Sequence, residues 1–453
     1  MLPTEWSVRL VDASVTRLTD KHLAWADYAF VSGMVVQRDS ARQVIARCKK
    51  AGLKVVAGGP LFTGEHADFD EVDHFVLNEA EITLPRFLAD LENGCAQRLY
   101  ATTEFADVRE SPVPRWDLAE LGRYASMSVQ YSRGCPYDCE FCNVTTLFGH
   151  RWRTKATRQV IAELDALYAA GWRGGVFFVD DNLIGNRGAL KDELLPALIE
   201  WQRGKDLPLQ TQLSIDVADD ELLTKMLVDA GFRTVFIGIE TPHEESLAEC
   251  NKRQNKGRDL VDDVKRLQRA GLEVQGGFIV GFDHDLTDIF QRQIEFIQKS
   301  GIVTAMVGLL QAPPGTRLYD RLRGEGRLRA TSSGDNVDGT TNIVPVMKLT
   351  ALLDGYQRIL QTIYSPKHYY ARVRTFLREY RAPSAKTSLS GRQLLAFFRS
   401  IYRLGILGRE RFEYWRLLIW TIYRRPTRFP MAVTFAIYGY HFRKTCERHV
   451  TSS

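Results

Sequence analysis

Short apolar runs alternate with amphipathic stretches over the first 105 residues. The runs at residues 8–12, 28–34, 54–59 and 74–80 have the length and composition of buried strands. Residues 40–51 form a helical pattern that Gly52 ends. Strand, helix and strand in this order predict a parallel sheet with helices on its faces. We therefore expect residues 1–105 to form a Rossmann-like domain.

A unit of helix, glycine and apolar strand repeats between residues 127 and 325. Each helix ends at a small residue followed by glycine, at Gly171, Gly231, Gly271 and Gly301, because glycine readily adopts the left-handed turn that stops a helix. The apolar strands lie at residues 127–134, 175–181, 209–216, 234–241, 274–283 and 303–311. Apolar strands joined by crossover helices predict an α/β fold with a parallel sheet buried on both faces. Six such units predict a partial (β/α)6 barrel of the TIM type.

Two further segments flank this core. Residues 106–126 contain two closely spaced prolines and are expected to be an extended linker. Residues 326–453 are expected to be a helical region, with helices at 349–360 and 367–378.

The end of the chain is aromatic and basic. From residue 391 onward it holds 12 Lys and Arg but 3 acidic residues, while the whole chain has a net charge of +5, so the body is net acidic. Arg392, Arg399 and Arg403 share one face of a predicted helix. Two interpretations stay open: a helical lid over the barrel mouth, or a peripheral contact with an anionic membrane surface.

Composition limits the cellular setting. A content of 45% hydrophobic and 25% charged residues is that of a soluble globular protein. The sequence shows no signal peptide and no apolar stretch of spanning length. Seven cysteines, three of them clustered, indicate metal binding in a reducing compartment. We expect a cytoplasmic location, peripheral to the inner membrane face if the basic end binds lipid, and no nucleic-acid partner.

Residues 135–142 read CPYDCEFC and place Cys135, Cys139 and Cys142 on one short loop. Three thiolates are one fewer than an ordinary iron–sulfur cube uses. A zinc site would also want a fourth ligand, and His150 is the histidine that follows closely. The economical interpretation is a four-iron cluster with one iron open to a non-protein ligand. A zinc site in a non-catalytic metal-binding protein is the alternative.

Acidic residues lie at the carboxyl ends of four of the predicted core strands: Asp180 with Asp181, Asp216, Glu240 and Asp283. In barrels of this kind the chemistry lies at the carboxyl ends of the strands. Buried unpaired carboxylates are destabilising, so packing alone does not explain these residues. A helix N-cap is the alternative role for Asp181 and Asp216. The basic run at residues 150–155 either steers an anionic group or is an exposed loop.

The cysteine spacing, with Phe141 before the last cysteine, resembles the signature of the radical S-adenosylmethionine (SAM) superfamily. The resemblance implies a [4Fe-4S] cluster on the three cysteines, SAM on the open iron, and an external flavodoxin- or ferredoxin-like electron donor. It implies reductive cleavage of SAM to a 5′-deoxyadenosyl radical. By position, it implies SAM contacts from Phe141, Val179, Asp180, Asp181, Ser214, Glu240, Ile279 and Val280.

The first domain resembles the cobalamin-binding domain of the cobalamin-dependent branch. The runs VSGM (31–34), VVAGGP (55–60) and NEAE (78–81) carry this resemblance. It implies cobalamin contacts from Ser32, Gly33, Gly58, Gly59 and Glu79. The Asp-x-His-x-x-Gly segment that would ligate cobalt is absent, and the domain lacks the strand that relatives place first. We expect a start further upstream or a degenerate domain.

The usual reaction of this branch is methylation of an unactivated carbon, here on a small-molecule or lipid-like substrate. A cobalamin-independent radical rearrangement or ring closure is the alternative. Methylthiolation is less favoured, because the remaining cysteines are scattered along the chain, at Cys48, Cys95, Cys250 and Cys446.

Overall fold

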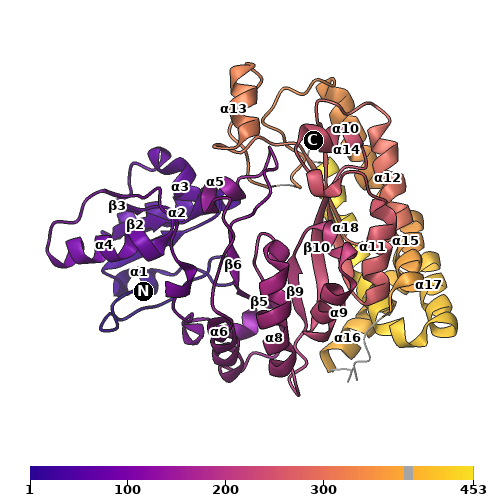
Figure 1. Cartoon of the computed structure of the whole chain (residues 1–453), viewed down its shortest axis with the longest axis horizontal. Helices are drawn as coiled ribbons and strands as arrows, with labels where there is room; N and C mark the ends of the chain where they lie inside the picture. Colours follow the sequence, from indigo (N-terminus) through magenta and orange to yellow (C-terminus); the bar gives the residue numbers. More distant parts are fainter. Residues whose placement is uncertain (336, 382–390, 452–453) are drawn as a thin grey trace. The chain divides into compact units, whose positions relative to one another are not determined.

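The computed structural model describes residues 1–335, 337–381 and 391–451. Its contacts divide the chain into two compact units (Figure 1). The first unit comprises Met1–Asn186, Ala312–Glu325 and Ala330–Asp335, and the second comprises Arg187–Gln311, Gly326–Arg329 and Asn336–Ser453. Both units combine parallel strands with helices, so the predicted α/β class is confirmed. Among the described helices, none has both the length and the apolar composition needed to cross a bilayer.

The first unit begins with a parallel sheet in the order β1-β2-β3-β4. Its strands are β1 (Tyr28–Ser32), β2 (Lys54–Gly58), β3 (His74–Val76) and β4 (Leu99–Tyr100). The accompanying helices are α1 (Asp20–Trp25), α2 (Arg38–Lys50), α3 (Pro60–Glu65) and α4 (Ala80–Glu92). Three predicted strands and the helix α2 are confirmed. β4 was not predicted, because two residues are too few to leave a pattern.

The predicted strand at residues 8–12 is wrong. These residues pair with no described strand, and the Arg9 guanidinium lies 4.2 Å from the centre of the Trp25 ring. An apolar run forms a strand only where a neighbouring strand supplies hydrogen-bond partners.

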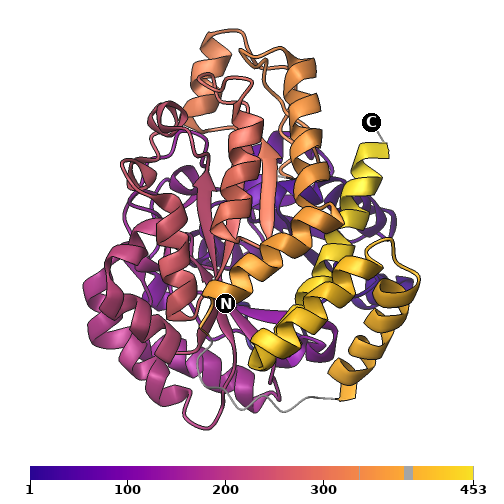
Figure 2. The same cartoon turned by 90° about the vertical axis from the view of Figure 1, so that its right-hand side faces the viewer.

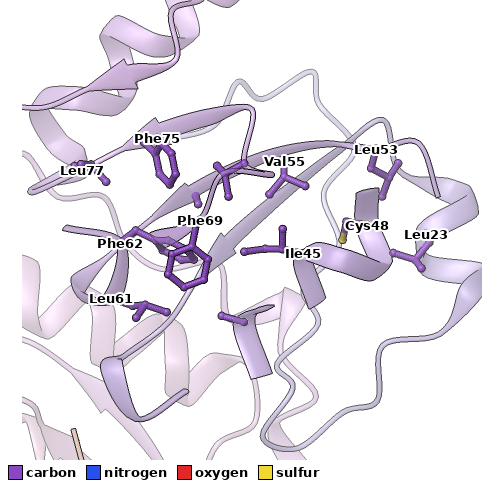
Figure 3. Packing of buried hydrophobic residues seen from close by; sticks show 13 residues of the cluster. Leu23, Ile45, Cys48, Leu53, Val55, Leu61, Phe62, Phe69, Phe75 and Leu77 are labelled. Carbon is purple, nitrogen blue, oxygen red and sulfur yellow. The ribbon is translucent and has the colours of Figure 1, made fainter. Parts of the chain in front are cut away.

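The core of this sheet packs against α2 and α3 (Figure 3). Ile45 of α2 and Phe62 of α3 belong to one buried cluster with Val55 of β2, Phe69 and Phe75. On the other face, α4 buries its Phe87 in a second cluster. Burying each of these side chains contributes about 1.5–3 kcal/mol. Helices on both faces of a parallel sheet make this part Rossmann-like.

The rest of the first unit carries the cysteine loop. β5 (Ser126–Val129) pairs in parallel with β8 (Gly175–Phe178), and β6 (Ser132–Arg133) pairs antiparallel with β7 (Arg153–Thr154). The helices are α5 (Val144–Phe148), α6 (Thr157–Ala169) and α13 (Arg317–Gly324), and the 3-10 helix η6 (Leu183–Gly185) follows β8.

The second unit is built on four parallel strands in the order β9-β10-β11-β12. They are β9 (Leu209–Gln212), β10 (Phe232–Glu240), β11 (Glu273–Val280) and β12 (Ala305–Leu309). The helical segments are α7 (Arg187–Ala189), η7 (Leu190–Leu194), α8 (Leu195–Trp201), η8 (Ile215–Asp219), α9 (Glu221–Asp229), α10 (Glu244–Glu249), α11 (Leu260–Ala270) and α12 (Ile289–Ser300). With β5 and β8 of the first unit, all six predicted core strands are confirmed.

The two faces of β11 differ. Phe278 is buried and its ring lies 5.8 Å from that of Phe296 on α12, while Gln275 and Ile279 on the opposite face are half-buried. Met306 of β12, paired in register with Gly277, is 41% exposed on that second face. The sheet therefore has one face covered by helices and one more open face.

The predicted helical C-terminal region is confirmed. It contains α14 (Leu349–Ile363), α15 (Pro366–Glu379), α16 (Gly391–Ser400), the π-helical segment η10 (Ile401–Ile406), α17 (Arg411–Arg424) and α18 (Phe429–Thr451). Figure 2 shows α17 and α18 (yellow) side by side, and both pack on α15. The side chain of Arg392 lies outside the described part of the chain.

The expectation of a lid over the carboxyl ends of the strands is wrong for α15, α17 and α18. Arg372 of α15 is fully buried and donates to the carbonyl of Val303, which precedes β12, at 3.2 Å. The Tyr369 hydroxyl donates to the carbonyl of Phe435 in α18 at 2.7 Å. The fold thus places α15, on which α17 and α18 pack, at the amino ends of the strands.

Candidate metal centre and cofactor sites

Cys135, Cys139 and Cys142 lie on the loop that connects β6 to β7. All three are half-buried. The Cys142 N–H donates to the Cys139 carbonyl at 3.1 Å, and the Cys135 N–H donates to the Gly149 carbonyl at 3.3 Å. The loop is thus closed on itself, and three cysteines on one short closed loop suit the ligand set of a [4Fe-4S] cluster.

A single metal ion requires a different arrangement. Within the described ranges, no three His, Cys, Asp or Glu side chains are grouped as the ligands of one ion. Each cysteine of an iron–sulfur cube binds a different iron atom, so its ligands stand around the cube and do not meet at one point.

Gly134 sets the direction in which the chain enters the cysteine loop. Its φ is +89°, and a Cβ there would lie 2.4 Å from the Arg151 carbonyl oxygen. Both the left-handed backbone and the close approach require glycine. The backbone conformation and the close Arg151 carbonyl therefore explain why glycine precedes Cys135, without any contact to a metal.

Two strand-end acids hold the segment that leads to this glycine. The Asp180 carboxylate accepts from the Ser132 hydroxyl at 2.5 Å, from the Tyr131 N–H at 3.2 Å and from the Ser132 N–H. Asp181 accepts from the Gly134 N–H. We call Asp180 and Asp181 the acid clamp, because together they fix residues 131–134.

Burial dominates the electrostatics of the acid clamp. It raises the pKa of Asp180 to about 7 and that of Asp181 to about 6, against the hydrogen bonds that oppose the shift. Asp180 is fully buried, so its carboxylate holds backbone and presents no surface to a ligand. Asp181 is not a helix N-cap, because Asn182 occupies that position before η6.

The ribbon that carries the loop places two arginines opposite each other. Arg133 of β6 and Arg153 of β7 are register partners, and like charges in that position repel. Glu81 of α4 accepts from Arg133 at 2.8 and 3.0 Å, and Glu79 accepts from Arg153 at 2.6 and 2.8 Å. Two glutamates of the first sheet domain therefore neutralise the base of the cysteine loop.

This network bears on two predictions. In the basic run at 150–155, His150 and Arg151 are exposed, whereas Arg153 and Lys155 form ion pairs with Glu79 and Glu163 and are not available to steer an anion. Glu79, a candidate cobalamin contact, is 4% exposed and its carboxylate is held by arginine. Glu81 and Arg133 were missed, because no sequence pattern links α4 to β6.

The segment 312–325 secures the cysteine loop from another direction. Arg321 of α13 donates to the Glu140 carboxylate at 2.7 and 3.1 Å, and Arg317 lies 2.9 Å from the Asp138 carboxylate. Phe141 follows Glu140 and is half-buried. Val179, which precedes the acid clamp, extends the β5–β8 pairing through its N–H, which donates to the Val129 carbonyl at 2.9 Å.

The predicted cobalamin contacts of β1 and β2 lie together at one sheet edge. Gly59 has φ +87°, and a Cβ there would lie 2.4 Å from the Ser32 hydroxyl. A Cβ on Gly58 would lie 2.5 Å from the Val76 carbonyl, and the Leu61 N–H donates to the Gly33 carbonyl at 3.0 Å. The carboxyl edge of a parallel sheet is where such domains bind ligands, and the exposed Ser32 with small neighbours fits that use.

In the second unit, Glu240 and Ile279 are tied together by a residue that the sequence analysis missed. The Gln293 amide donates to the carbonyls of Glu240, at 3.2 Å, and Ile279, at 2.8 Å. Ile279 is half-buried on the open face of β11, while Val280 points to the helix-covered face and is fully buried. Ser214 is 9% exposed at the end of β9.

Glu240 has an unusual backbone for its residue type. Its φ is +63°, and such left-handed backbone outside glycine is found at strained, often functional, positions. Its carboxylate lies 2.7 Å from the Lys252 ammonium. Asp216 and Asp283 are likewise paired, with Arg187 and Arg327 at 2.5 Å each. The strand-end acids Asp216, Glu240 and Asp283 of this unit are therefore each paired with a base.

Comparison with known proteins agrees with this geometry. The profile of the radical SAM superfamily matches residues 129–309, and a domain of unknown function, DUF4070, matches residues 316–453. An uncharacterized methyltransferase of Synechocystis sp., sll1242, is 39% identical over 98% of this chain and 84% of its own length. The hopanoid C-2 methylase of Rhodopseudomonas palustris is 34% identical over 92% of this chain and 81% of its own.

Two solved structures share the fold. TsrM of Kitasatospora setae, a radical SAM methyltransferase solved with cobalamin and a [4Fe-4S] cluster, matches with a TM-score of 0.59 at 14% identity, over 93% of this chain and 90% of its own. OxsB, a cobalamin-dependent SAM radical enzyme, matches with a TM-score of 0.60 at 14% identity, over 96% of this chain and 73% of its own. With the cysteine loop and the two relatives above 30% identity, these matches lead to one conclusion: the chain belongs to the radical SAM superfamily.

Proposed function

We propose that this enzyme transfers a methyl group to an unactivated carbon of a lipid-like small molecule, using a [4Fe-4S] cluster, SAM and cobalamin. The observation that carries the proposal is the cysteine loop, closed on itself and fixed at its entry by the acid clamp. The names of the two long relatives, a methyltransferase and a hopanoid methylase, support methyl transfer and a lipid-like substrate.

Each part of the chain has a separate task in this proposal. Cys135, Cys139 and Cys142 hold the cluster. The proposed SAM contacts are Phe141, Val179, Asp181, Ser214, Glu240, Ile279 and the backbone of Val280, with Asp180 positioning the loop from within. The proposed cobalamin contacts are Ser32, Gly33, Gly58 and Gly59. When bound, the cluster supplies an electron for SAM cleavage and cobalamin carries the methyl group.

The protein itself supplies orientation and exclusion of water. The acid clamp and the Glu81–Arg133 pair keep the cysteine loop in one shape, and Gln293 keeps the ends of β10 and β11 together. We further propose that the six core strands form a partial barrel within residues 127–325. The domain boundaries proposed for the chain lie at residues 105, 126 and 325. An external flavodoxin- or ferredoxin-like donor and a cytoplasmic site of action complete the proposal.

The test is anaerobic purification with cobalamin supplied during expression. Holoenzyme incubated with SAM and a reductant is expected to release 5′-deoxyadenosine, and corrinoid absorbance is expected to co-elute with the protein. The Cys139→Ala variant should lose both iron and 5′-deoxyadenosine but keep the corrinoid. A preparation that binds iron and never cleaves SAM would contradict an enzymatic role, and cleavage without bound corrinoid would favour the cobalamin-independent rearrangement.

A further inference from the structure

Helix α17 presents large apolar side chains on both of its faces. Tyr414, Leu417, Leu418 and Thr421 are buried against the protein. The opposite face leaves exposed Phe412 (75%), Trp415 (40%), Ile419 (52%), Ile422 (50%) and Tyr423 (82%). A helix that is apolar all round needs a covering on each side, and the described protein covers only one.

The neighbouring segment continues this exposed face. In α16 and η10 the outward residues are Leu394, Leu395, Phe398, Tyr402 and Ile406, and Leu407 follows, all 49–63% exposed. The Trp415 indole donates to the Gly405 carbonyl at 3.0 Å, and the hydroxyls of Ser400 and Tyr414 lie 2.8 Å apart. These contacts join the segments, and we call the outward residues of α16, η10 and α17 the apolar–basic surface.

The charge on this surface is positive. Its exposed cations are Arg399, Arg403, Arg409, Arg411, Arg416 and Arg424. The acids of the same stretch turn inward: Glu410 is 1% exposed and lies 2.9 Å from Arg443, and Glu413 pairs with Arg374 and Arg416. A second copy packed through this same surface would bring arginines against arginines, so the charge favours an anionic occupant.

We propose that the apolar–basic surface binds the anionic face of a lipid bilayer. Exposed leucine, isoleucine and phenylalanine side chains enter the boundary of the acyl chains, and tryptophan and tyrosine lie at the headgroup level. The arginines contact lipid phosphates. This assigns a membrane-binding task to part of the region of unknown function at 316–453. The inference does not rest on methyl transfer and holds for any substrate.

The experiment is flotation of the full-length holoenzyme with vesicles. We expect binding to phosphatidylcholine vesicles that contain phosphatidylglycerol, little binding to phosphatidylcholine alone, and release in about 1 M salt, where the Debye length is about 3 Å. The Phe412→Glu, Ile419→Glu double variant should bind vesicles at least about tenfold more weakly than the parent, because charges replace inserted apolar groups. Neutralising Arg399, Arg403 and Arg424 to Gln should weaken binding by about a hundredfold.

Leu222→Glu is the matched control. Leu222 lies on α9 of the same unit and is 59% exposed, so its replacement should leave flotation unchanged. Iron content and thermal unfolding verify that each variant is folded. The arginine variants replace exposed charged side chains and keep the exposed apolar residues, so they test the charge separately. Equal flotation of the double variant and the parent, equal loss in Leu222→Glu, or salt-insensitive binding would each overturn the proposal. A dimer in sedimentation velocity that the double variant disperses, with no vesicle binding, would identify a second copy as the occupant and also overturn it.

Discussion

The Ser132 hydroxyl donates to the Asp180 carboxylate at 2.5 Å inside the protein, three residues before the first cysteine. Asp180 follows β8, so this bond joins the end of one core strand to the segment that leaves its neighbour β5. A carboxylate that accepts three hydrogen bonds from two adjacent residues restricts their backbone strongly. The relationship makes the shape of the cysteine loop a property of the apoprotein.

Removing the Asp180 carboxylate should therefore disorganise the cysteine loop. Asp180→Ala leaves buried N–H groups without acceptors, at a cost of about 1–3 kcal/mol each. We expect lower unfolding free energy in urea and a reduced iron content, with all three cysteines still present. Asp354→Ala, an exposed acid on α14, is the control and should change neither quantity. Full iron incorporation in Asp180→Ala would refute a positioning role.

The acid clamp also predicts a pH dependence of stability. Burial raises the pKa of Asp180 from 3.8 to about 7 and that of Asp181 from 3.8 to about 6. A carboxyl with a raised folded pKa binds its proton more tightly when folded, so its contribution to stability decreases as pH rises from about 4 to about 7. Urea unfolding of the apoprotein should show the parent losing stability across this window relative to Asp180→Asn, Asp181→Asn. A constant difference between the two proteins would contradict the prediction.

Glu81 should behave in the opposite sense. Burial would raise its pKa, but the hydrogen bonds of Arg133 and Ser111 lower it from 4.5 to about 2. Its stabilising contribution is present above about 4.5 and is lost as pH decreases towards 2. In urea unfolding of the apoprotein, Glu81→Gln should remove the loss of stability between about pH 4.5 and about 2, a window that lies largely below that of the acid clamp.

Glu81→Gln should also be costly at neutral pH. Arg133 and Glu81 side chains are 16% and 7% exposed, and removing one partner of a buried pair costs up to about 3–5 kcal/mol. The cost is smaller here, because Arg133 keeps the Glu79 carboxylate at 3.5 Å. The arginine that remains faces Arg153 across the ribbon, so iron content and SAM cleavage should decrease together. Asp117→Asn breaks an ion pair that is exposed at both partners and should leave both quantities unchanged. An unaltered cluster in Glu81→Gln would show that the ribbon tolerates the repulsion.

Glu240 and Lys252 give a test of the proposed SAM contacts. Glu240→Gln removes the negative charge proposed to meet SAM and should weaken SAM binding by about tenfold, or about 1.4 kcal/mol. Lys252→Met removes the ammonium group that lies 2.7 Å from the Glu240 carboxylate. The variant should therefore destabilise the fold without weakening SAM binding. Equilibrium dialysis with SAM measures both, with Glu245→Gln as an exposed control from the same segment. Parallel losses in the Glu240 and Lys252 variants would indicate a purely structural ion pair.

The sequence by itself determined the α/β class, the six core strands and the cysteine loop. These features are local: apolar runs mark strands, glycine ends helices, and three thiols within eight residues share one short segment. It also placed Asp180, Asp181 and Glu240 at strand ends, because parallel strands collect their carboxyl ends at one edge.

Only the tertiary structure decided what those residues do. Whether Asp180 meets a ligand or holds backbone depends on Ser132, 48 residues away along the chain. The partners of Arg133 and Arg153 are Glu81 of α4 and Glu79 just before it, and Gln293 reaches two strand ends from α12. The outward face of α17 likewise emerges only once its inner face is seen to be buried. Such pairings depend on the distances between segments that are remote in sequence. These distances decide which side chains are buried and which charges are paired, and a local sequence pattern does not contain them.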